Sequence, residues 1–209
     1  MRILAMPKTG FKDIGIDSIG FYSPQNFVDL QKLAKARNIA FNKLKYGLMT
    51  YEMRVPAEGE DIISLGLKAA KNALIRGRIS AKDIDAVFVG TETMTYAVKS
   101  VSNIIKDLLG ISPQCLTQDV YNACAAGTLA VLNAVAQIES GFISKALVIA
   151  VDISSYDLNS PGEPTQGAGA VAMVICKNPR IAVFSNSIGK VSGNINDFYR
   201  PAGDRKSVV

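Results

Sequence analysis

A cysteine between a strand-like and a helix-like stretch is the residue best placed to act as a nucleophile. Cys124 follows Val120 and Tyr121, which favour a strand. The apolar residues after it recur at helical spacing: Leu129, Val131, Leu132, Val135 and Ile138. Free amides and the positive end of the dipole in the first turn of a buried helix favour a thiolate, the nucleophilic form of cysteine. Position alone leaves open that Cys124 is an ordinary buried thiol.

Glu92 is the candidate for proton transfer. It follows a nearly continuous apolar run, residues 84–89, which is typical of a strand buried on both faces. Ligands often bind at the carboxyl end of such a strand. A carboxylate kept from water there has a raised pKa and can exchange protons near neutral pH. The alternative is a turn acid or a helix cap.

Composition excludes several kinds of site. The chain of 209 residues has no histidine, which excludes a Ser-His-Asp triad, a Cys-His pair and His-containing metal sites within it. The net charge is +5, but lysines and arginines are scattered. We therefore expect neither nucleic-acid binding nor a basic membrane-binding helix, and we expect no metal.

Cysteine usage and hydropathy indicate a compartment. The three cysteines form no CxxC pair and are odd in number, which suggests a reducing environment. No apolar run of about 18 residues is present, and residues 1–13, broken by Pro7 and Gly10, do not fit a signal peptide. These features predict a cytoplasmic protein that does not span a membrane.

Strand and helix patterns alternate along the chain. We expect strands at 14–22, 84–89, 117–121, 146–151, 167–175 and 181–187, and helices at 30–36, 61–77, 98–109 and 125–140. This alternation predicts a layered α/β fold around a central sheet, without a linker or internal repeat.

The loop from Asn159 to Gly169 is rich in turn residues. Gly167 and Gly169 do not fit a nucleotide-binding motif, because a third glycine, the following helix and a P-loop lysine are missing. Close backbone approach to a neighbour is the better interpretation. From the pattern alone, Asp152 and Asp197 are more consistent with ordinary acidic residues of loops. The alternative is that their carboxylates orient other groups of the site.

Four segments, in order, resemble hydroxymethylglutaryl-CoA synthase of the thiolase superfamily. They are Gly90-Thr91-Glu92-Thr93, Ala123-Cys124-Ala125-Ala126-Gly127-Thr128, Asp157 to Met173 with its GEPTQGAGAVAM stretch, and Asp197-Phe198-Tyr199-Arg200-Pro201. The resemblance runs from about residue 13 to the end, and the third segment is its most specific part.

The resemblance implies a thiolase-like αβα fold with a mixed central sheet, and condensation of acetyl-CoA with acetoacetyl-CoA followed by hydrolysis. Cys124 matches the cysteine that becomes acetylated, and Glu92 matches the acid/base. Thr165 and Asn159 match positions lining the acyl pocket, while Asp152 and Asp197 match supporting carboxylates. CoA thioesters are then substrates, and no cofactor is implied.

The sequence departs from the family pattern in several features. Ala125 stands where many members have tyrosine, and Tyr96 where many have aspartate. The family's catalytic histidine and its CoA-binding lysines lie further along. Residues 1–209 therefore resemble the N-terminal half of the enzyme, either a truncation or one chain of a split enzyme whose companion carries the other half.

Two alternatives stay open. A ketoacyl carrier-protein synthase III shares the fold and the cysteine, but lacks this glutamate and the 161–169 loop. A non-catalytic chain, acting as a scaffold or partner subunit, would fit the missing histidine. By analogy with thiolase-type folds we expect a homodimer, formed through a core strand and the helix beside the nucleophile.

Overall fold

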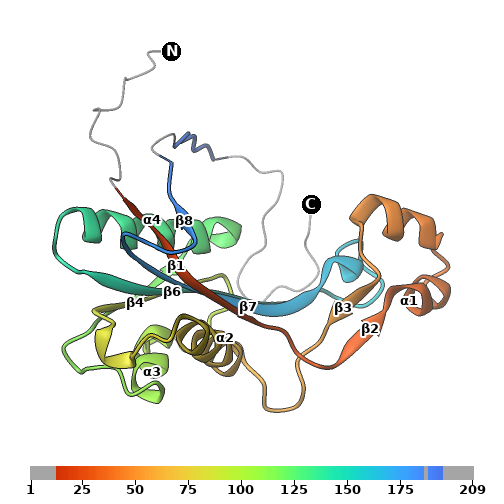
Figure 1. The fold of residues 1–209 in the computed structure, drawn as a ribbon. Helices are drawn as coiled ribbons and strands as arrows, with labels where there is room; N and C mark the ends of the chain where they lie inside the picture. The colour runs from red at the N-terminus through yellow and green to blue at the C-terminus, as the bar shows by residue number, and fades with distance from the viewer. Residues whose placement is uncertain (1–12, 186–187, 195–209) are drawn as a thin grey trace.

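A six-stranded mixed sheet, in the order β5-β4-β6-β7-β1-β8, forms the centre of the molecule (Figure 1). The computed structural model describes residues 13–185 and 188–194. The strands are β1 (Ile14–Tyr22), β4 (Ala86–Thr91), β5 (Leu116–Tyr121), β6 (Lys145–Ser154), β7 (Gly167–Lys177) and β8 (Ala182–Val183). β4, β5 and β6 are parallel, whereas β7, β1 and β8 pair antiparallel. The predicted mixed sheet is confirmed.

Helices cover both faces of this sheet, as a layered fold requires. α2 (Ile62–Gly77) and α3 (Val101–Leu108) pack on one face, where Val87, Leu147 and Val174 point toward them. α4 (Ala126–Glu139) packs on the other face against Phe88 and Val148. The strands β4 and β6 read as continuous apolar runs because both of their faces are buried.

A small unit projects from the end of β1 (Figure 1). It contains β2 (Phe27–Asp29), α1 (Leu30–Ala36), a π-helical turn (Lys43–Leu48) and β3 (Glu52–Arg54). Its separate core consists of Leu30, Leu33, Ala34, Leu44 and Met53. The sequence predicted α1 but no strand between residues 22 and 61, so the pairing of β2 with β3 was missed.

Local signals explain where several elements begin and end. The Asp61 side chain accepts the Ser64 amide, and the Ser64 hydroxyl accepts the Asp61 amide, so the start of α2 is capped on both sides. Arg78, not Gly77, takes the left-handed conformation that ends this helix, with φ 51°. Short turns stand at Ala81–Asp83, Ala123–Ala125 and Glu163–Thr165.

Two strands differ in length from the prediction. The strand predicted at 181–187 is only two residues long in β8, while residues 186–187 lie outside the described part. β6 is longer than predicted and continues to Ser154, which brings Asp152 inside the strand. Among the helices in residues 13–185 and 188–194, none is long and apolar enough to cross a membrane.

Candidate active site

Cys124 lies in the short helical turn Ala123–Ala125, between the end of β5 and the start of α4. The sequence placed it inside the first turn of a buried helix, which is wrong in two respects. The α-helix proper begins at Ala126, and the Cys124 side chain is exposed. The preceding residue, Ala123, has φ 45°, so the chain turns sharply just before the cysteine.

Two glycines allow this turn to approach the sheet. A Cβ on Gly90, in β4, would lie 2.6 Å from the carbonyl carbon of Ala126. A Cβ on Gly127 would lie 2.9 Å from the Cβ of Ala150 in β6. The start of α4 therefore rests directly on the ends of β4 and β6. Sequence reasoning missed this function of Gly90, although a glycine ending a buried strand is a signal for close backbone approach.

A cavity of about 380 Å³ opens beside the cysteine. Its walls come from β4, the 123–125 turn, α4, β6 and β7. The lining residues are Gly90, Ala123, Cys124, Gly127, Thr128, Val131, Ala150, Val151, Asp152 and Met173. Of the residues predicted to act in the site, the fold brings Cys124 and Asp152 to this one cavity.

Asp152 organises the turn that follows β4. Its Oδ1 accepts hydrogen bonds from Thr91 Oγ1 at 2.8 Å, the Glu92 amide at 2.8 Å, the Thr93 amide at 3.1 Å and Thr93 Oγ1 at 3.0 Å. Hydrogen bonds to an ionised acceptor are stronger than those between neutral groups. The carboxylate is therefore a rigid support for residues 91–93, so the interpretation of Asp152 as an ordinary loop acid is wrong.

Glu92 directly follows β4, as predicted, but its side chain is exposed. The expectation that it is kept from water does not hold in this chain, because no described element covers the turn beyond the end of the sheet. Glu92 is also absent from the residues that line the cavity beside Cys124. Its backbone is fixed through Asp152, while its side chain faces open space.

Asn159 and Thr165 lie on the loop between β6 and β7, and neither lines the Cys124 cavity. Both are exposed; Asn159 has φ 62°, and the Thr165 hydroxyl donates to the Gly162 carbonyl at 2.7 Å. The close-approach prediction fails for Gly167, because a Cβ there would meet nothing within 4 Å. In this loop the tight position is Gly162, where a Cβ would lie 2.8 Å from the Tyr156 ring.

A half-buried ion pair holds this loop, and sequence reasoning missed it. Glu163 is 3% exposed and accepts two hydrogen bonds from Arg37, each of 2.8 Å, as well as one from the Asn159 amide at 2.8 Å. The Arg37 guanidinium lowers the pKa of the Glu163 carboxyl. The two residues are 126 positions apart, and no local pattern could have paired them.

The other cysteines are poor candidates for reaction. Burial raises the pKa of Cys115 to about 11 and also raises that of Cys176. Asp197 lies outside the described residues. Within residues 13–185 and 188–194, no group of three Cys, Asp or Glu residues is placed to hold a metal ion.

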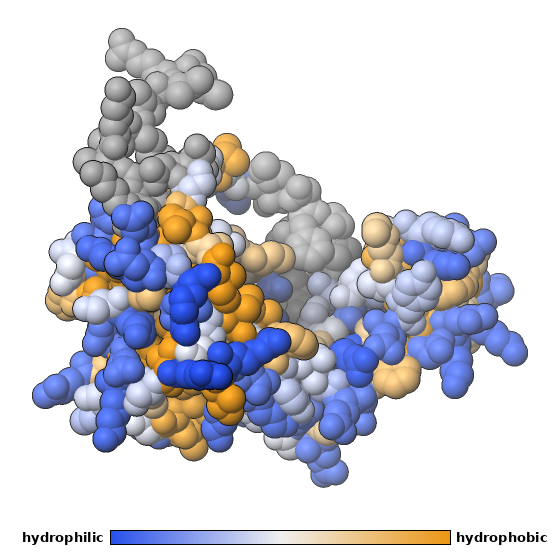
Figure 2. Space-filling view, in the orientation of Figure 1, coloured by the Kyte–Doolittle hydropathy of each residue, from blue (hydrophilic) through white to orange (hydrophobic). Residues whose placement is uncertain are grey.

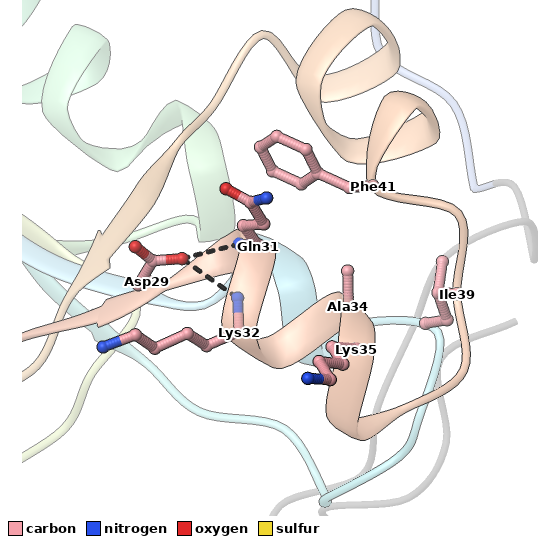
Figure 3. A pocket seen from close by; sticks show the side chains of 7 residues that line it. All are labelled: Asp29, Gln31, Lys32, Ala34, Lys35, Ile39 and Phe41. Atoms are coloured by element: carbon pink, nitrogen blue, oxygen red, sulfur yellow. Dashed lines mark hydrogen bonds between the residues drawn. The ribbon is translucent and has the colours of Figure 1, made fainter.

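A second hollow, of about 430 Å³, lies on the projecting unit beside α1 (Figure 3). Lys32 and Lys35 on its wall are exposed, and Asp29 is occupied in capping α1 through the amides of Gln31 and Lys32. None of the predicted site residues lines this hollow. The cavity beside Cys124 is therefore the stronger candidate for chemistry.

Comparison with known proteins decides the family. The model of the hydroxymethylglutaryl-coenzyme A synthase N-terminal region matches residues 10–180. The chain belongs to this family. It is 37% identical over 190 residues to the hydroxymethylglutaryl-CoA synthase of Enterococcus faecalis, and 34% identical over 189 residues to that of Methanocaldococcus jannaschii. These matches cover 91% and 90% of this chain, but 49% and 54% of the relatives, so the chain spans about half their length.

Solved structures of the hydroxymethylglutaryl-CoA synthase family share the fold. MvaS in complex with 3-hydroxy-3-methylglutaryl coenzyme A is 35% identical with a TM-score of 0.89, covering 95% of this chain and 48% of that one. An HMG-CoA synthase complexed with CoA is 32% identical with a TM-score of 0.86, covering 93% and 50%. The predicted thiolase-like α/β fold is confirmed.

Proposed function

We propose that this chain is the nucleophile-bearing half of an enzyme that condenses acetyl-CoA with acetoacetyl-CoA to give 3-hydroxy-3-methylglutaryl-CoA and CoA. The observation that carries the proposal is the exposed Cys124 at a cavity whose wall also holds Asp152, the support of the Glu92 backbone. Family membership and the names of the synthase relatives support the same reaction class.

The proposed reaction uses Cys124 as an acyl carrier. The thiolate attacks the carbonyl of acetyl-CoA and releases CoA, leaving an acetyl thioester on Cys124. Glu92 then takes a proton from the acetyl methyl group, and the resulting carbanion attacks the ketone carbon of acetoacetyl-CoA. The alkoxide formed there takes up a proton. Water finally hydrolyses the thioester bond to Cys124. This step frees the cysteine and releases 3-hydroxy-3-methylglutaryl-CoA, whose CoA thioester stays intact.

The proposal gives the neighbouring residues supporting functions. As the family resemblance implies, Asp152 and Asp197 support the site, and Thr165 and Asn159 contact the acyl substrate in the complete enzyme, although neither lines the Cys124 cavity of this chain. Because Glu92 is exposed here and the chain has no histidine, turnover also needs the polypeptide half that the relatives have and this chain does not span. The CoA thioesters are the substrates in this proposal, and the reaction uses no cofactor.

CoA thioesters are favoured over carrier-protein substrates. The synthase structures bound to 3-hydroxy-3-methylglutaryl coenzyme A and to CoA cover at least 93% of this chain. The HMG synthase of the curacin biosynthetic pathway, in complex with acetyl donor-ACP, covers 79% with a TM-score of 0.73. This difference supports a function in the mevalonate pathway of isoprenoid synthesis rather than in polyketide synthesis, and the odd number of unpaired cysteines supports a cytoplasmic compartment.

A homodimer is the proposed assembly. β5 is an edge strand of the described sheet and runs straight into the Cys124 turn. Antiparallel pairing of two copies of β5 would satisfy its free backbone groups and bring the two cysteine turns together. Light scattering on the purified chain should give twice the mass of one chain; a monomer at all concentrations would contradict this.

Acetylation of Cys124 tests the reaction directly. The chain, alone and together with the C-terminal half of the E. faecalis synthase, is incubated with radiolabelled acetyl-CoA. We expect label on Cys124, no label on Cys124→Ala, and unchanged labelling of Cys115→Ala. If the complemented protein takes up no label, the proposal is wrong.

A second candidate is a non-catalytic partner subunit, which the absence of histidine favours. It predicts that mixing with the second half gives a complex without acetyl transfer to Cys124, so the same assay separates the two. A carrier-protein synthase would instead use acyl carrier protein in preference to acetoacetyl-CoA, which a competition experiment would reveal.

A further inference from the structure

An ion pair between two distant parts of the chain fixes the loop that holds Asn159 and Thr165. Arg37 stands at the C-terminal end of α1 in the projecting unit, whereas Glu163 lies in the loop between β6 and β7, residues 155–166. The Arg37 guanidinium donates from Nε to one Glu163 oxygen and from Nη2 to the other, each at 2.8 Å. Such a two-pronged contact fixes direction as well as distance.

The projecting unit provides a fixed base for this contact. Its buried apolar residues form a core separate from those of the sheet, and Leu33 and Ala34 of α1 belong to it. The Arg37 amide extends the helical hydrogen bonding by donating to the Leu33 carbonyl at 2.9 Å. The surface of the unit shows mostly hydrophilic side chains, whereas hydrophobic ones gather over β1 and β8 (Figure 2). Polar contacts such as this ion pair therefore help to hold the unit and the loop together.

Glu163 lies in the interior of the loop as a carboxylate. It is 3% exposed, and its neighbours Gly162 and Pro164 are buried too. The Arg37 guanidinium lowers the pKa of Glu163, so both carboxylate oxygens accept hydrogen bonds at neutral pH. A buried charge that loses its partner is strongly destabilising. Without Arg37, the loop would therefore rearrange to bring Glu163 to water.

The backbone of Asn159 depends on the same carboxylate. Asn159 has φ 62°, in the left-handed region that asparagine enters more readily than most residues. Its amide donates at 2.8 Å to Oε2 of Glu163, the oxygen that also accepts Nε of Arg37. Glu163 thus fixes the backbone from which the exposed Asn159 side chain extends.

Thr165 is connected to Glu163 through the chain itself. Glu163–Thr165 forms one short helical turn, so Thr165 follows any movement of Glu163. The next residue, Gln166, donates to the Glu163 carbonyl at 3.1 Å and accepts the Tyr156 amide at 2.8 Å, which closes the loop on itself. A displacement of Glu163 is therefore passed to Asn159 and Thr165 together.

We propose that the ion pair of Arg37 with Glu163 positions the loop that binds the acyl substrate. Through this pair, the projecting unit sets the orientation of Asn159 and Thr165 and hence the affinity for the CoA thioester. The proposal rests on the proposed function, in which these two residues contact the acyl substrate. Arg37 and Glu163 are positioning residues, because they act through the loop.

The concentration dependence of Cys124 acetylation tests this proposal. Wild type and variants, each with the C-terminal half of the E. faecalis synthase, are labelled at a series of radiolabelled acetyl-CoA concentrations. We expect Arg37→Gln and Glu163→Ala to raise the half-saturation concentration about tenfold and to keep the maximal rate within about twofold, because they displace binding groups and not the nucleophile. Glu163→Gln keeps an oxygen for the Asn159 amide and should raise the half-saturation concentration less.

The matched control is a similar ion pair far from this loop. Arg180 contacts both carboxylate oxygens of Asp17, at 2.8 and 2.6 Å, beyond the other end of β7. Arg180→Gln should lower stability without changing the half-saturation concentration. A loss of stability alone reduces the amount of protein that takes up label, whereas the folded molecules keep their affinity. The control therefore separates positioning from a purely structural contribution.

Hydrogen exchange covers the case in which the variants at residues 37 and 163 do not fold. It is measured on the Cys124→Ala chain, which cannot be acetylated there, with and without saturating acetyl-CoA. Residues 157–166 and 34–38 should both gain protection, because the loop and the end of α1 are joined by the ion pair. Residues 178–181, around the control arginine, should not.

Failure of this proposal differs from failure of the proposed function. A wild-type complex that takes up no label contradicts the proposed function, and the positioning proposal then falls with it. If the wild type is labelled but the variants at residues 37 and 163 keep its half-saturation concentration, or shift it no more than Arg180→Gln, the positioning proposal alone is overturned. Unchanged exchange at residues 157–166 or 34–38 also overturns it.

Discussion

The carboxylate of Asp152 holds the backbone of Glu92, accepting its amide at 2.8 Å across 60 positions of sequence. The same oxygen accepts both the amide and the hydroxyl of Thr93. The turn after β4 is thus fixed by a residue of the neighbouring strand, which also lines the Cys124 cavity. The nucleophile and the turn that carries the proposed base are connected through one side chain.

Asp152→Ala should lower both stability and acetyl transfer. Loss of a charged acceptor leaves several donors without a partner, and we expect the free energy of unfolding to fall by about 2–3 kcal/mol in urea titrations. Asp152→Asn keeps one oxygen and should lose less. Asp83→Asn, at an exposed turn residue, is the control and should change little. Equal stability of Asp152→Ala and wild type would contradict the supporting function.

Gly90→Ala should displace the start of α4. The new methyl group would lie 2.6 Å from the Ala126 backbone, which cannot yield without moving the Cys124 turn. We expect a loss of about 1–3 kcal/mol in unfolding free energy, as for other overpacked sites, and slower acetylation of Cys124. Gly167→Ala, where nothing lies within 4 Å, is the matched control; an equally large loss of stability there would show that crowding at Gly90 is not the cause.

Thiol alkylation should select Cys124. Its side chain is exposed, whereas burial raises the pKa of Cys115 to about 11 and that of Cys176 above its usual range. Because the thiolate is the reacting form, iodoacetamide at pH 7.5 should modify one cysteine per folded chain. Mass spectrometry should find none modified in Cys124→Ala. Fast labelling of Cys115 in that variant would show that burial does not protect it.

A fall in pH should destabilise the loop before α2, because Glu60 then becomes protonated. This carboxylate accepts hydrogen bonds from Lys68 at 2.7 Å, Tyr22 at 2.8 Å and the Ala57 amide at 3.0 Å, and these bonds lower its pKa from 4.5 to about 2. A lowered folded-state pKa gives stability that is present above pH 4.5 and is lost as pH falls toward 2. The Glu163 pKa is lowered by Arg37 and adds to the same trend.

Replacement of Glu60 measures its share of this acid sensitivity. Urea midpoints between pH 2.5 and 6 should fall less steeply in Glu60→Gln than in wild type, because the amide does not titrate. Glu58→Gln, at an exposed neighbour, should keep the wild-type slope. If both variants show the same pH dependence as wild type, the hydrogen bonds to Glu60 do not contribute to acid sensitivity.

The sequence by itself determined the alternation of strands and helices, the family motifs and the candidate nucleophile. These follow from local chemistry: apolar periodicity marks strands that are buried on both faces, and glycine, proline and capping residues mark where the elements end. Cys124 and Glu92 do follow the ends of predicted strands, because strand ends are local features too, although Cys124 precedes the α-helix instead of lying in its first turn.

Only the tertiary structure decided which distant residues meet and which surfaces stay open. The contacts of Asp152 with residues 91–93, and of Arg37 with Glu163, join positions 59 to 126 apart, and no short-range pattern encodes them. The exposure of Glu92 likewise depends on what covers the sheet in space. Burial is a property of the packed layers, so the sequence supplied the reactive residues while the fold determined how much of their surroundings this chain provides.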